Sequence, residues 1–478
     1  MFNEFDAKSY ALPRTGVEFS SSRPELKRVF DDCERLLKDN IKVYNGRRVL
    51  IEGSNYRNVW LETQPMGGEM YAKRDVEVGL NNLLIFMQYQ RRDGRMPGMI
   101  SDMSDRMLGV VAHYDWIQGF YFAHQALRMC DWIGPDERYL RLVAGAMEDF
   151  YGYIMKYRTG NPNGIPEEWC VWDSGEDNCA RFLRLGARDG GFGGETPPQD
   201  SGRLPFQSME YAGYCYDMAA TLAEIHDLLG DDRSGHWRNE AAEHRRRVKA
   251  HLWNESRGAC FDRDRDGVPI DSLNHINLRC MHLGLFDDGM ARTFIQRHLL
   301  NPDEFWTKLP MPATAIHDLF FVNDPVNNWS GSCQGLILIY QRAVDALMNY
   351  GRHDLVARLG EIWLSNLARN GRYVQQYDPF TGDYNDGIDG YGPTMLAALE
   401  YIAMMYGGVR RRDRLLFSAV GGADASDYTQ HMGERTLRVM RRDGKMRALL
   451  NGREVYSGNC GQCVVTDLQG QILSVERI

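Results

Sequence analysis

The sequence lacks three features that mark particular protein classes. Its first residues, MFNEFDAKSYALPRTG, contain no basic segment followed by an apolar one, so we expect no signal peptide. No run approaches the roughly 18 apolar residues of a membrane helix, so we expect no membrane partner. The net charge is -9, without the large Lys/Arg clusters that neutralise phosphates, so we expect no nucleic-acid partner. We therefore predict a cytoplasmic protein.

Motifs for metals and disulfides are also scarce. Among 10 scattered cysteines, only Cys460 and Cys463 have redox or metal spacing, and no second such pair supports that role. The segment 261–270, FDRDRDGVPI, imitates a calcium loop, but its twelfth position is Leu273 instead of Glu. We interpret this segment as a turn between short strands, with calcium binding left open. We predict no metal and no cofactor.

Helical periodicity is abundant. Between about residues 23 and 406, apolar residues recur at positions i, i+3, i+4 and i+7, which is typical of amphipathic helices. The segments with this pattern are 23–40, 76–92, 115–133, 137–157, 208–230, 236–253, 288–300, 333–351, 353–370 and 393–408.

The order of these segments predicts the fold class. Many come as pairs of one mixed-polar and one apolar-rich helix, as in a ring of helical hairpins. We therefore predict an all-α dominated chain, with an (α/α)6 toroid over residues 1–410. From residue 411 to 478, short strand-like runs are separated by DG, NG and QG turns, which predict a small C-terminal β appendage.

Long loops interrupt the helical pattern at 52–75, 158–207, 301–332 and 371–392. Loops of this length in a compact domain are usually functional or disordered. One of them contains CVWDSGEDNCARF at 170–182, where Trp172, and Trp169 just before the stretch, precede a group of acids. This stretch fits a sugar site, with a ring stacked on the sugar and an acid at the glycosidic oxygen. It also fits a helix N-terminus with Asp173 or Ser174 as the N-cap.

Four loop segments occur in a characteristic order. They are QPMGGEMYAKRDVEVGLNNLLIFMQYQRRDGRMPG at 64–98, WDSGEDNCARF at 172–182, NNWSGSCQGLILIY at 327–340 and QQYDPFTGDY at 375–384. Together they resemble glycoside hydrolase family 63 and the related trehalases. The compact bacterial members that act on mannosylglycerate or glucosylglycerate are the most similar in appearance.

The resemblance implies an inverting glycoside hydrolase acting on a small α-linked glucoside or mannoside. Asp173 takes the position of the general acid, and Gln375 takes the position of the glutamate that serves as general base. Inversion needs the two groups about 6.5–9.5 Å apart, with room for a water between them. We therefore expect Asp173 and Gln375 to face each other across a sugar-sized gap.

Gln375 departs from the family pattern. An amide cannot take a proton from water near neutral pH, and loss of a general base typically costs about 10²–10⁴-fold in rate. Either glutamine has replaced a native glutamate, which we favour because the surrounding motif is intact, or glutamine is the natural residue. We predict an inactive variant of a hydrolase. The alternative is a non-hydrolytic sugar-binding or sugar-isomerising protein on the same toroid.

The remaining candidates are substrate-binding side chains. Aromatic rings stack on sugars, and carboxylates or guanidinium groups bind sugar hydroxyls or an acidic aglycone. For each residue, core packing or a structural ion pair is the competing interpretation. The expected partner is a small oligosaccharide or glycoside, and the candidates are Trp60, Tyr71, Asp75, Trp172, Glu176, Arg181, Trp329, Tyr377 and Asp386.

Overall fold

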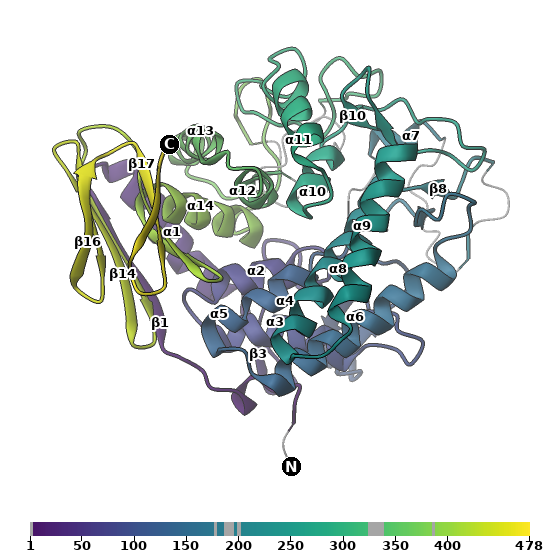
Figure 1. Cartoon of the computed structure of the whole chain (residues 1–478), viewed down its shortest axis with the longest axis horizontal. Coiled ribbons are helices and arrows are strands. Elements are labelled where there is room, and N and C mark those ends of the chain that lie inside the picture. The colour runs from purple at the N-terminus through teal and green to yellow at the C-terminus, as the bar shows by residue number, and fades with distance from the viewer. Residues whose placement is uncertain (1–2, 176–178, 186–195, 198–201, 324–338, 385–387) are drawn as a thin grey trace.

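The structure is a computed structural model that describes residues 3–175, 179–185, 196–197, 202–323, 339–384 and 388–478. Helices are its most abundant secondary structure, and a β region lies at one side (Figure 1). The helices are α1 (Pro24–Asp39), α2 (Gln64–Tyr71), α3 (Val76–Gln88), α4 (Ala123–Arg128), α5 (Cys130–Ile133), α6 (Glu137–Tyr157), α7 (Ala180–Leu183), α8 (Met209–Leu229), α9 (Ser234–His251), α10 (Ile276–His282), α11 (Asp288–Phe294), α12 (Tyr340–Met348), α13 (His353–Asn370) and α14 (Gly392–Tyr406).

Most of the predicted helices are present, with corrected ends. The predicted helix 115–133 begins only at Ala123 and is divided into α4 and α5, and the predicted helix 288–300 changes from α11 to a π-helical turn at Ile295–Leu299. Part of the predicted helix 333–351 lies outside the described residues. Three short helices were not predicted: α2, α7 and α10. Of these, α2 and α10 are buried on most sides and so lack a clear apolar stripe.

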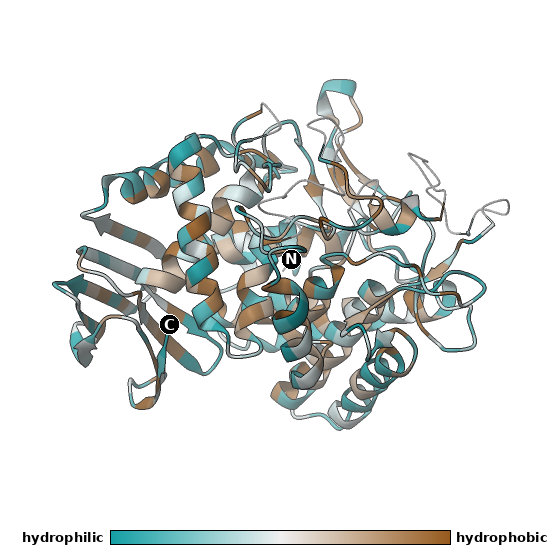
Figure 2. Cartoon of the chain, turned by 90° about the horizontal axis from the view of Figure 1, so that it is seen from above, coloured by the Kyte–Doolittle hydropathy of each residue, from teal (hydrophilic) through white to brown (hydrophobic). Residues whose placement is uncertain are grey.

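Neighbouring helices pack as pairs with different burial. In α9, the buried residues are Trp237, Ala241, His244 and Val248, a single stripe of helical spacing. Its partner α8 and the later helix α14 are buried nearly all round. Figure 2 shows the resulting mixture of hydrophilic and hydrophobic helix faces.

Local signals set the helix ends. The Ser208 side chain accepts a hydrogen bond from the Tyr211 N–H and caps α8, which ends at Gly230 with φ +70°. In the same way, Asp75 caps α3 by accepting from the Val78 N–H.

The β region consists of two antiparallel sheets packed face to face. One has the order β1-β13-β14-β15-β16 and the other β11-β12-β17-β18. Apolar side chains of both sheets form their own core between them. The strands are β1 (Thr15–Ser21), β11 (Gly408–Arg411), β12 (Arg414–Ala419), β13 (Ser426–Met432), β14 (Arg435–Arg442), β15 (Lys445–Leu450), β16 (Arg453–Asn459), β17 (Gln462–Asp467) and β18 (Ile472–Arg477).

Turn chemistry and topology explain this region. Asp443-Gly444 and Asn451-Gly452 have positive φ at both positions, as two-residue hairpin turns require. β1, which the sequence pattern did not predict, pairs with β13 along its whole length. The division at residue 410 stays a prediction, although this N-terminal strand belongs to the C-terminal sheet.

Short sheets organise the loops between helices. β4 (Val59–Trp60), β5 (Met99–Asp102) and β6 (Val110–His113) form one of them, and β7 (Glu167–Glu168) pairs with β8 (Phe206–Gln207). The other two pairs are β2 (Ile41–Tyr44) with β3 (Arg47–Leu50), and β9 (Trp253–Asn254) with β10 (Ala259–Cys260).

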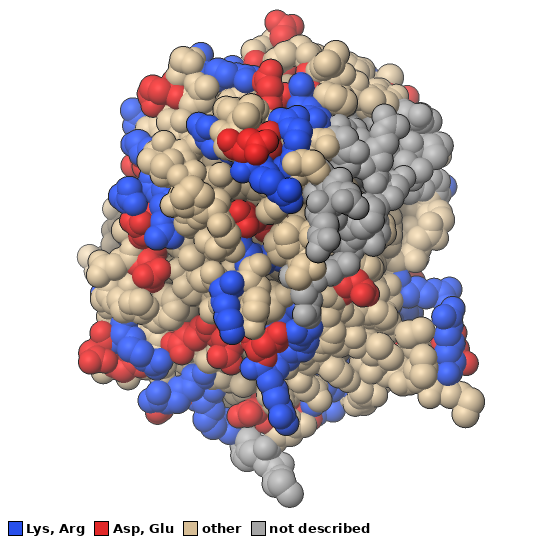
Figure 3. Space-filling model, turned by 90° about the vertical axis from the view of Figure 1, so that its right-hand side faces the viewer, with Lys and Arg blue, Asp and Glu red and all other residues tan. Residues whose placement is uncertain are grey.

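Helix hydropathy and surface charge can be compared with the sequence-based expectations. None of its helices is both long and apolar enough to cross a membrane. On the face drawn in Figure 3, basic and acidic side chains are interspersed.

Candidate functional site

Asp173 lies in the packed interior. Its carboxylate accepts from the Arg158 guanidinium at 2.6 Å, and neither side chain is exposed. Oδ1 also accepts from the Ile117 N–H, and Oδ2 from the Trp169 and Cys170 N–H groups. Both oxygens are therefore engaged by the protein. The expectation that this carboxylate faces a sugar-sized gap is wrong.

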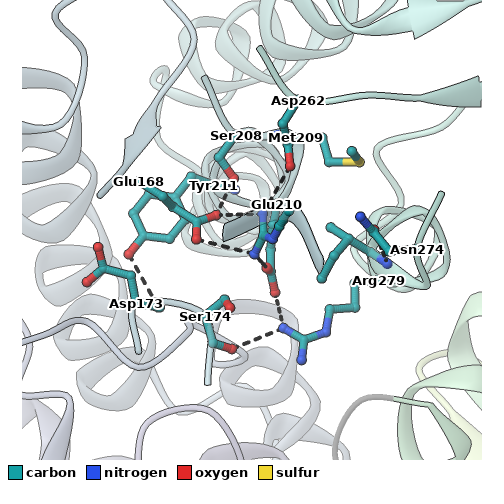
Figure 4. Close-up of polar contacts among 12 residues, drawn as sticks. Glu168, Asp173, Ser174, Ser208, Met209, Glu210, Tyr211, Asp262, Asn274 and Arg279 are labelled. Atoms are coloured by element: carbon teal, nitrogen blue, oxygen red, sulfur yellow. Dashed lines mark hydrogen bonds and ion pairs between the residues drawn. The ribbon is translucent and has the colours of Figure 1, made fainter. Parts of the chain in front are cut away.

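Further hydrogen bonds to backbone carbonyls fix the turn that follows the Asp173 side chain. The Asp173 carbonyl accepts from the Gly119 N–H at 2.6 Å and from the Tyr211 hydroxyl at 3.3 Å. The Ser174 carbonyl accepts from Arg279 at 3.0 Å. Figure 4 shows Arg279 reaching both this carbonyl and Glu210. The turn is thus held from several elements, and the acidic pair 176–177 follows it directly in the sequence.

Gly175 is the position in this turn that requires glycine. Its φ is +74°, and a Cβ would lie 1.8 Å from Oε2 of Glu62. The Glu62 carboxylate is itself placed by Arg279 at 3.2 Å and Arg342 at 3.4 Å. Backbone conformation and the close carboxylate therefore exclude any larger residue here.

Arg181 lies at the centre of a buried ionic group and not on a surface that a sugar could reach. It is 1% exposed and donates to Glu168, Asp262 and Glu210. The sequence allowed an ion pair within its own helix, but these partners come from three other segments. Glu210 also pairs with Arg279. In this position Arg181 joins chain segments, and the predicted contact with substrate is not supported.

The buried ionic group around Arg181 contains more carboxyl groups than guanidinium groups. Glu62, Glu168, Glu210 and Asp262 are joined by three guanidinium groups, those of Arg181, Arg279 and Arg342. Burial raises the pKa of Glu168, whereas Glu210 is also buried but Arg279 and Arg181 hold its pKa low. Glu168 therefore retains a proton more readily than Glu210.

Gln375 lies in the loop before α14 and is 6% exposed. Its Oε1 accepts from the Tyr56 hydroxyl at 3.0 Å, and its Nε2 donates to the Tyr391 hydroxyl at 3.3 Å. Tyr391 in turn donates to Oε1 of Glu52 at 2.7 Å. The amide therefore occupies a directional chain of hydrogen bonds that ends on a carboxylate.

Two of the predicted aromatic residues are half-buried. Trp172 packs edge-to-face against Trp116 with ring centroids 5.1 Å apart. Trp60, on β4, has a buried Nε1 with no hydrogen-bond partner in the part of the chain that the structure describes. Both rings remain candidates for a sugar-contacting wall.

Other predicted site residues have structural roles. Tyr71 is 4% exposed and belongs to the core. Asp75 caps α3 and pairs with Arg48 at 2.7 Å. Tyr377 is fully buried and donates its hydroxyl proton to the Arg372 carbonyl. The burial of Tyr71 and Tyr377 argues against contact with substrate, whereas for Asp75 this contact stays a prediction. Glu176, Trp329 and Asp386 lie outside the described residues.

The calcium-like segment forms a turn, as predicted, and two of its three carboxylates are engaged by the protein. Asp262 accepts from the Met209 N–H at 2.7 Å, besides its pair with Arg181. Asp264 accepts from the Val268 N–H and from Arg203. These contacts engage carboxylate oxygens of Asp262 and Asp264. Fewer oxygens would therefore be available to coordinate a calcium ion.

A protein-family model matches most of this chain. The model of the Mannosylglycerate hydrolase MGH1-like glycoside hydrolase domain matches residues 70–393, more than half of the chain. This chain belongs to that family. Glycoside hydrolysis is therefore its class of reaction, and the resemblance to family 63 is confirmed. Among curated proteins, none matches significantly.

Solved structures show where the MGH1-like fold recurs. The GH63 mannosylglycerate hydrolase from Thermus thermophilus, in complex with Tris, is 18% identical, with a TM-score of 0.65 over 78% of this chain and 99% of that one. A sialidase is 13% identical, with a TM-score of 0.72 over 95% of this chain and 42% of that one. The neutral trehalase Nth1 from Saccharomyces cerevisiae is 12% identical, with a TM-score of 0.58 over 78% and 80%.

The match to the MGH1-like domain includes the Asp173 turn, Arg181 and Gln375, but not Trp60. Sequence reasoning missed Tyr56, Tyr391 and Glu52, the partners around Gln375. Glu52 and Tyr56 begin the long loop at 52–75, and Tyr391 directly precedes α14. A carboxylate and aromatic residues at the ends of two long loops were the available signal.

Proposed function

We propose that this MGH1-like protein binds a small α-linked glucoside or mannoside at one end of an (α/α)6 toroid. We also propose that the chain hydrolyses this ligand slowly. Pairing of an amphipathic helix with one that is buried nearly all round supports the toroid. The two long loops that meet at Gln375 support a site at one end of it.

The environment of Gln375 carries the proposal. This residue stands where the family resemblance places the general base, and its side chain is an amide held by two tyrosine hydroxyls. A neutral amide can orient a water but cannot deprotonate it. Removing a general base typically lowers the rate by about 10²–10⁴-fold.

The direction of the hydrogen bonds supports glutamine as the residue that these surroundings accommodate. Tyr391 has one hydroxyl proton, and it donates this proton to Glu52. The Gln375 amide supplies the proton that the Tyr391 oxygen accepts. A glutamate at 375 would compete with Glu52 for the single proton of Tyr391. This favours a natural glutamine over a replaced glutamate.

The proton donor of the reaction must be reassigned, because the Asp173 carboxylate is buried in an ion pair with Arg158. We place it on Glu176 or Asp177, which follow the anchored turn directly. Inversion then requires this acid to protonate the glycosidic oxygen while a water attacks the opposite face of the sugar. In this scheme Gln375 binds that water, and slow turnover follows from the missing base.

A second candidate function is sugar binding without turnover, which the same amide favours. Titration calorimetry with mannosylglycerate, glucosylglycerate and trehalose measures binding, and NMR of the first-formed anomer measures hydrolysis and its stereochemistry. We expect wild type and Gln375→Glu to bind the same sugar, and only the Glu variant to release the inverted product at a substantial rate.

The results separate the alternatives. Equal hydrolysis rates of wild type and Gln375→Glu would contradict the role given to Gln375. A retained anomer would contradict inversion, and no binding of any of these sugars would contradict the substrate class. Binding by both proteins with turnover by neither would support the sugar-binding alternative.

A further inference from the structure

Three helices direct potential metal ligands toward one point, in a group that the proposed reaction does not use. His124 lies on α4, His282 on α10 and Asp345 on α12, and their ligand atoms all lie within 4.8 Å of one another. The two imidazole centroids are 4.9 Å apart. We propose that this group is a divalent transition-metal site, with zinc as the preferred ion.

Both imidazoles are oriented as metal ligands usually are. Nδ1 of His124 contacts the Asp217 carboxylate at 2.8 Å, and Nδ1 of His282 contacts the Arg342 carbonyl at 3.2 Å. An imidazole that donates from Nδ1 to such an acceptor presents the lone pair of Nε2. Both Nε2 atoms are thus available to a metal, with partners behind them that fix the rings.

The side chain of Gln125 marks the point that both lone pairs face. Its Nε2 lies 2.7 Å from Nε2 of His124 and 3.4 Å from Nε2 of His282. Gln125 is fully buried, and its Oε1 has no hydrogen-bond partner among the described residues. A buried acceptor without a partner is unfavourable, because it has lost its hydrogen bonds to water without replacing them. Rotation of the amide by half a turn would bring this oxygen to the metal as a fourth ligand.

The dimensions fit after a small contraction. Nε2 of His124 is 3.8 Å from Oδ2 of Asp345. Zinc bonds of about 2.0–2.1 Å in a tetrahedron place ligands about 3.3 Å apart. A cavity of about 510 Å³, lined by residues including His124, Asp217 and His282, adjoins the group and allows an ion to reach it.

Positive charge beside the site sets its affinity. Asp345 pairs with Arg128 at 2.5 Å and with Arg411. These cations compete with a metal for the carboxylate, so the affinity of the wild type should be moderate. Removing the Arg128 charge should therefore tighten zinc binding, whereas loss of a merely structural ion pair would not.

A bound ion would join α4, α10 and α12. Because a ligand that binds only the folded state raises stability in proportion to the logarithm of its concentration, zinc should raise the melting temperature. The site is thus a structural clamp on the helical domain, apart from the catalytic proposal for Gln375.

The test uses tag-free full-length protein freed of metal with EDTA. Calorimetry with ZnCl₂ should show one ion per chain, and Co²⁺ should give the visible absorption bands of tetrahedral coordination. His124→Gln and His282→Gln should each weaken zinc binding at least tenfold. His353→Gln is the matched control, because His353 is also buried and contacts the Met404 carbonyl outside the group. Arg128→Gln should bind zinc more tightly than wild type.

Several results would overturn the proposal. Wild type that binds no Zn²⁺ at micromolar concentration, or that gives only octahedral Co²⁺ spectra, contradicts it without any variant. Equal affinity of wild type and both histidine variants assigns the binding to another site. The cobalt spectrum of the wild type decides the question even where a histidine variant fails to fold.

Discussion

Arg158 and Asp173 form an ion pair in which neither side chain is exposed, and the Arg158 guanidinium stacks 3.4 Å from the Trp169 ring centroid. Removing one partner of a buried pair leaves an uncompensated charge. Asp173→Asn should therefore lower the free energy of unfolding by about 3–5 kcal/mol, measured by urea denaturation.

The control is Asp31→Asn, which removes an exposed pair with Lys27 and should cost less than about 1 kcal/mol. If Asp173→Asn kept wild-type stability and lost only turnover, Asp173 would be catalytic after all.

Gly175→Ala should destabilise the turn before the acidic pair, because the new Cβ would meet Glu62 in addition to the strain of a φ of +74°. Gly230→Ala is the matched control, with a φ of +70° and nothing within 4 Å. The control measures left-handed strain alone, about 1–2 kcal/mol. Thermal unfolding should show a clearly larger loss of stability for Gly175→Ala than for Gly230→Ala. Equal losses would mean that the Glu62 side chain moves away from the new Cβ without cost.

Gln375→Glu should be less stable than wild type, because two carboxylates would then share the Tyr391 proton. Adding Glu52→Gln should restore much of the loss, since one amide and one carboxylate again flank Tyr391. A double-mutant cycle by urea unfolding measures this coupling, expected in the range of about 0.5–3 kcal/mol. Strictly additive effects of the two changes would show that Tyr391 does not link them.

Glu168 should make stability depend on pH. Burial raises its pKa from 4.5 to about 8, so its contribution is complete below pH 4.5 and is lost as pH rises through 8. Glu168→Gln stays neutral, so wild type should lose stability relative to this variant between pH 5 and 8. The slope cannot exceed about 1.4 kcal/mol per pH unit for one proton.

Glu243→Gln provides the control of opposite sign. Hydrogen bonds from Arg246 lower the pKa of Glu243 to about 2, so its contribution is present above pH 4.5 and is lost as pH falls. The difference between this variant and wild type should be constant from pH 5 to 8. A constant difference for Glu168→Gln as well would mean that Glu168 is ionised throughout.

The acid is tested in the background of Gln375→Glu, where turnover should be measurable. Either Glu176→Gln or Asp177→Asn should lower kcat strongly, by about 10²–10⁴-fold, and should remove the limb of the pH–rate profile that reports the acid. The other substitution should mainly change KM. Wild-type profiles for both would place the proton donor elsewhere.

How far the sequence predicts this protein depends on the range of the interactions involved. Helices such as α1 and α9 were predictable because their apolar stripes repeat at helical spacing. The C-terminal hairpins were predictable from turns such as Asp443-Gly444 and Asn451-Gly452. α10 was missed because every one of its residues is buried, so no polar face reveals a period.

Site residues were harder to predict. Asp173, Asp75 and Tyr377 have the residue types of a sugar site, but each meets partners that its own motif does not reveal. A loop that packs inward and a loop that lines a cavity can have the same composition, because both must satisfy buried polar groups.

The sequence by itself determined the family, the helical domain, the β hairpins and the exceptional glutamine at 375, since each rests on local pattern or on motif order. Only the tertiary structure decided that Asp173 belongs to Arg158, that Arg181 holds three carboxyl groups, and that Gln375 bridges Tyr56 and Tyr391. The reason is physical: whether a charged or polar side chain is free to meet a ligand depends on neighbours brought from distant segments, and burial makes those neighbours obligatory.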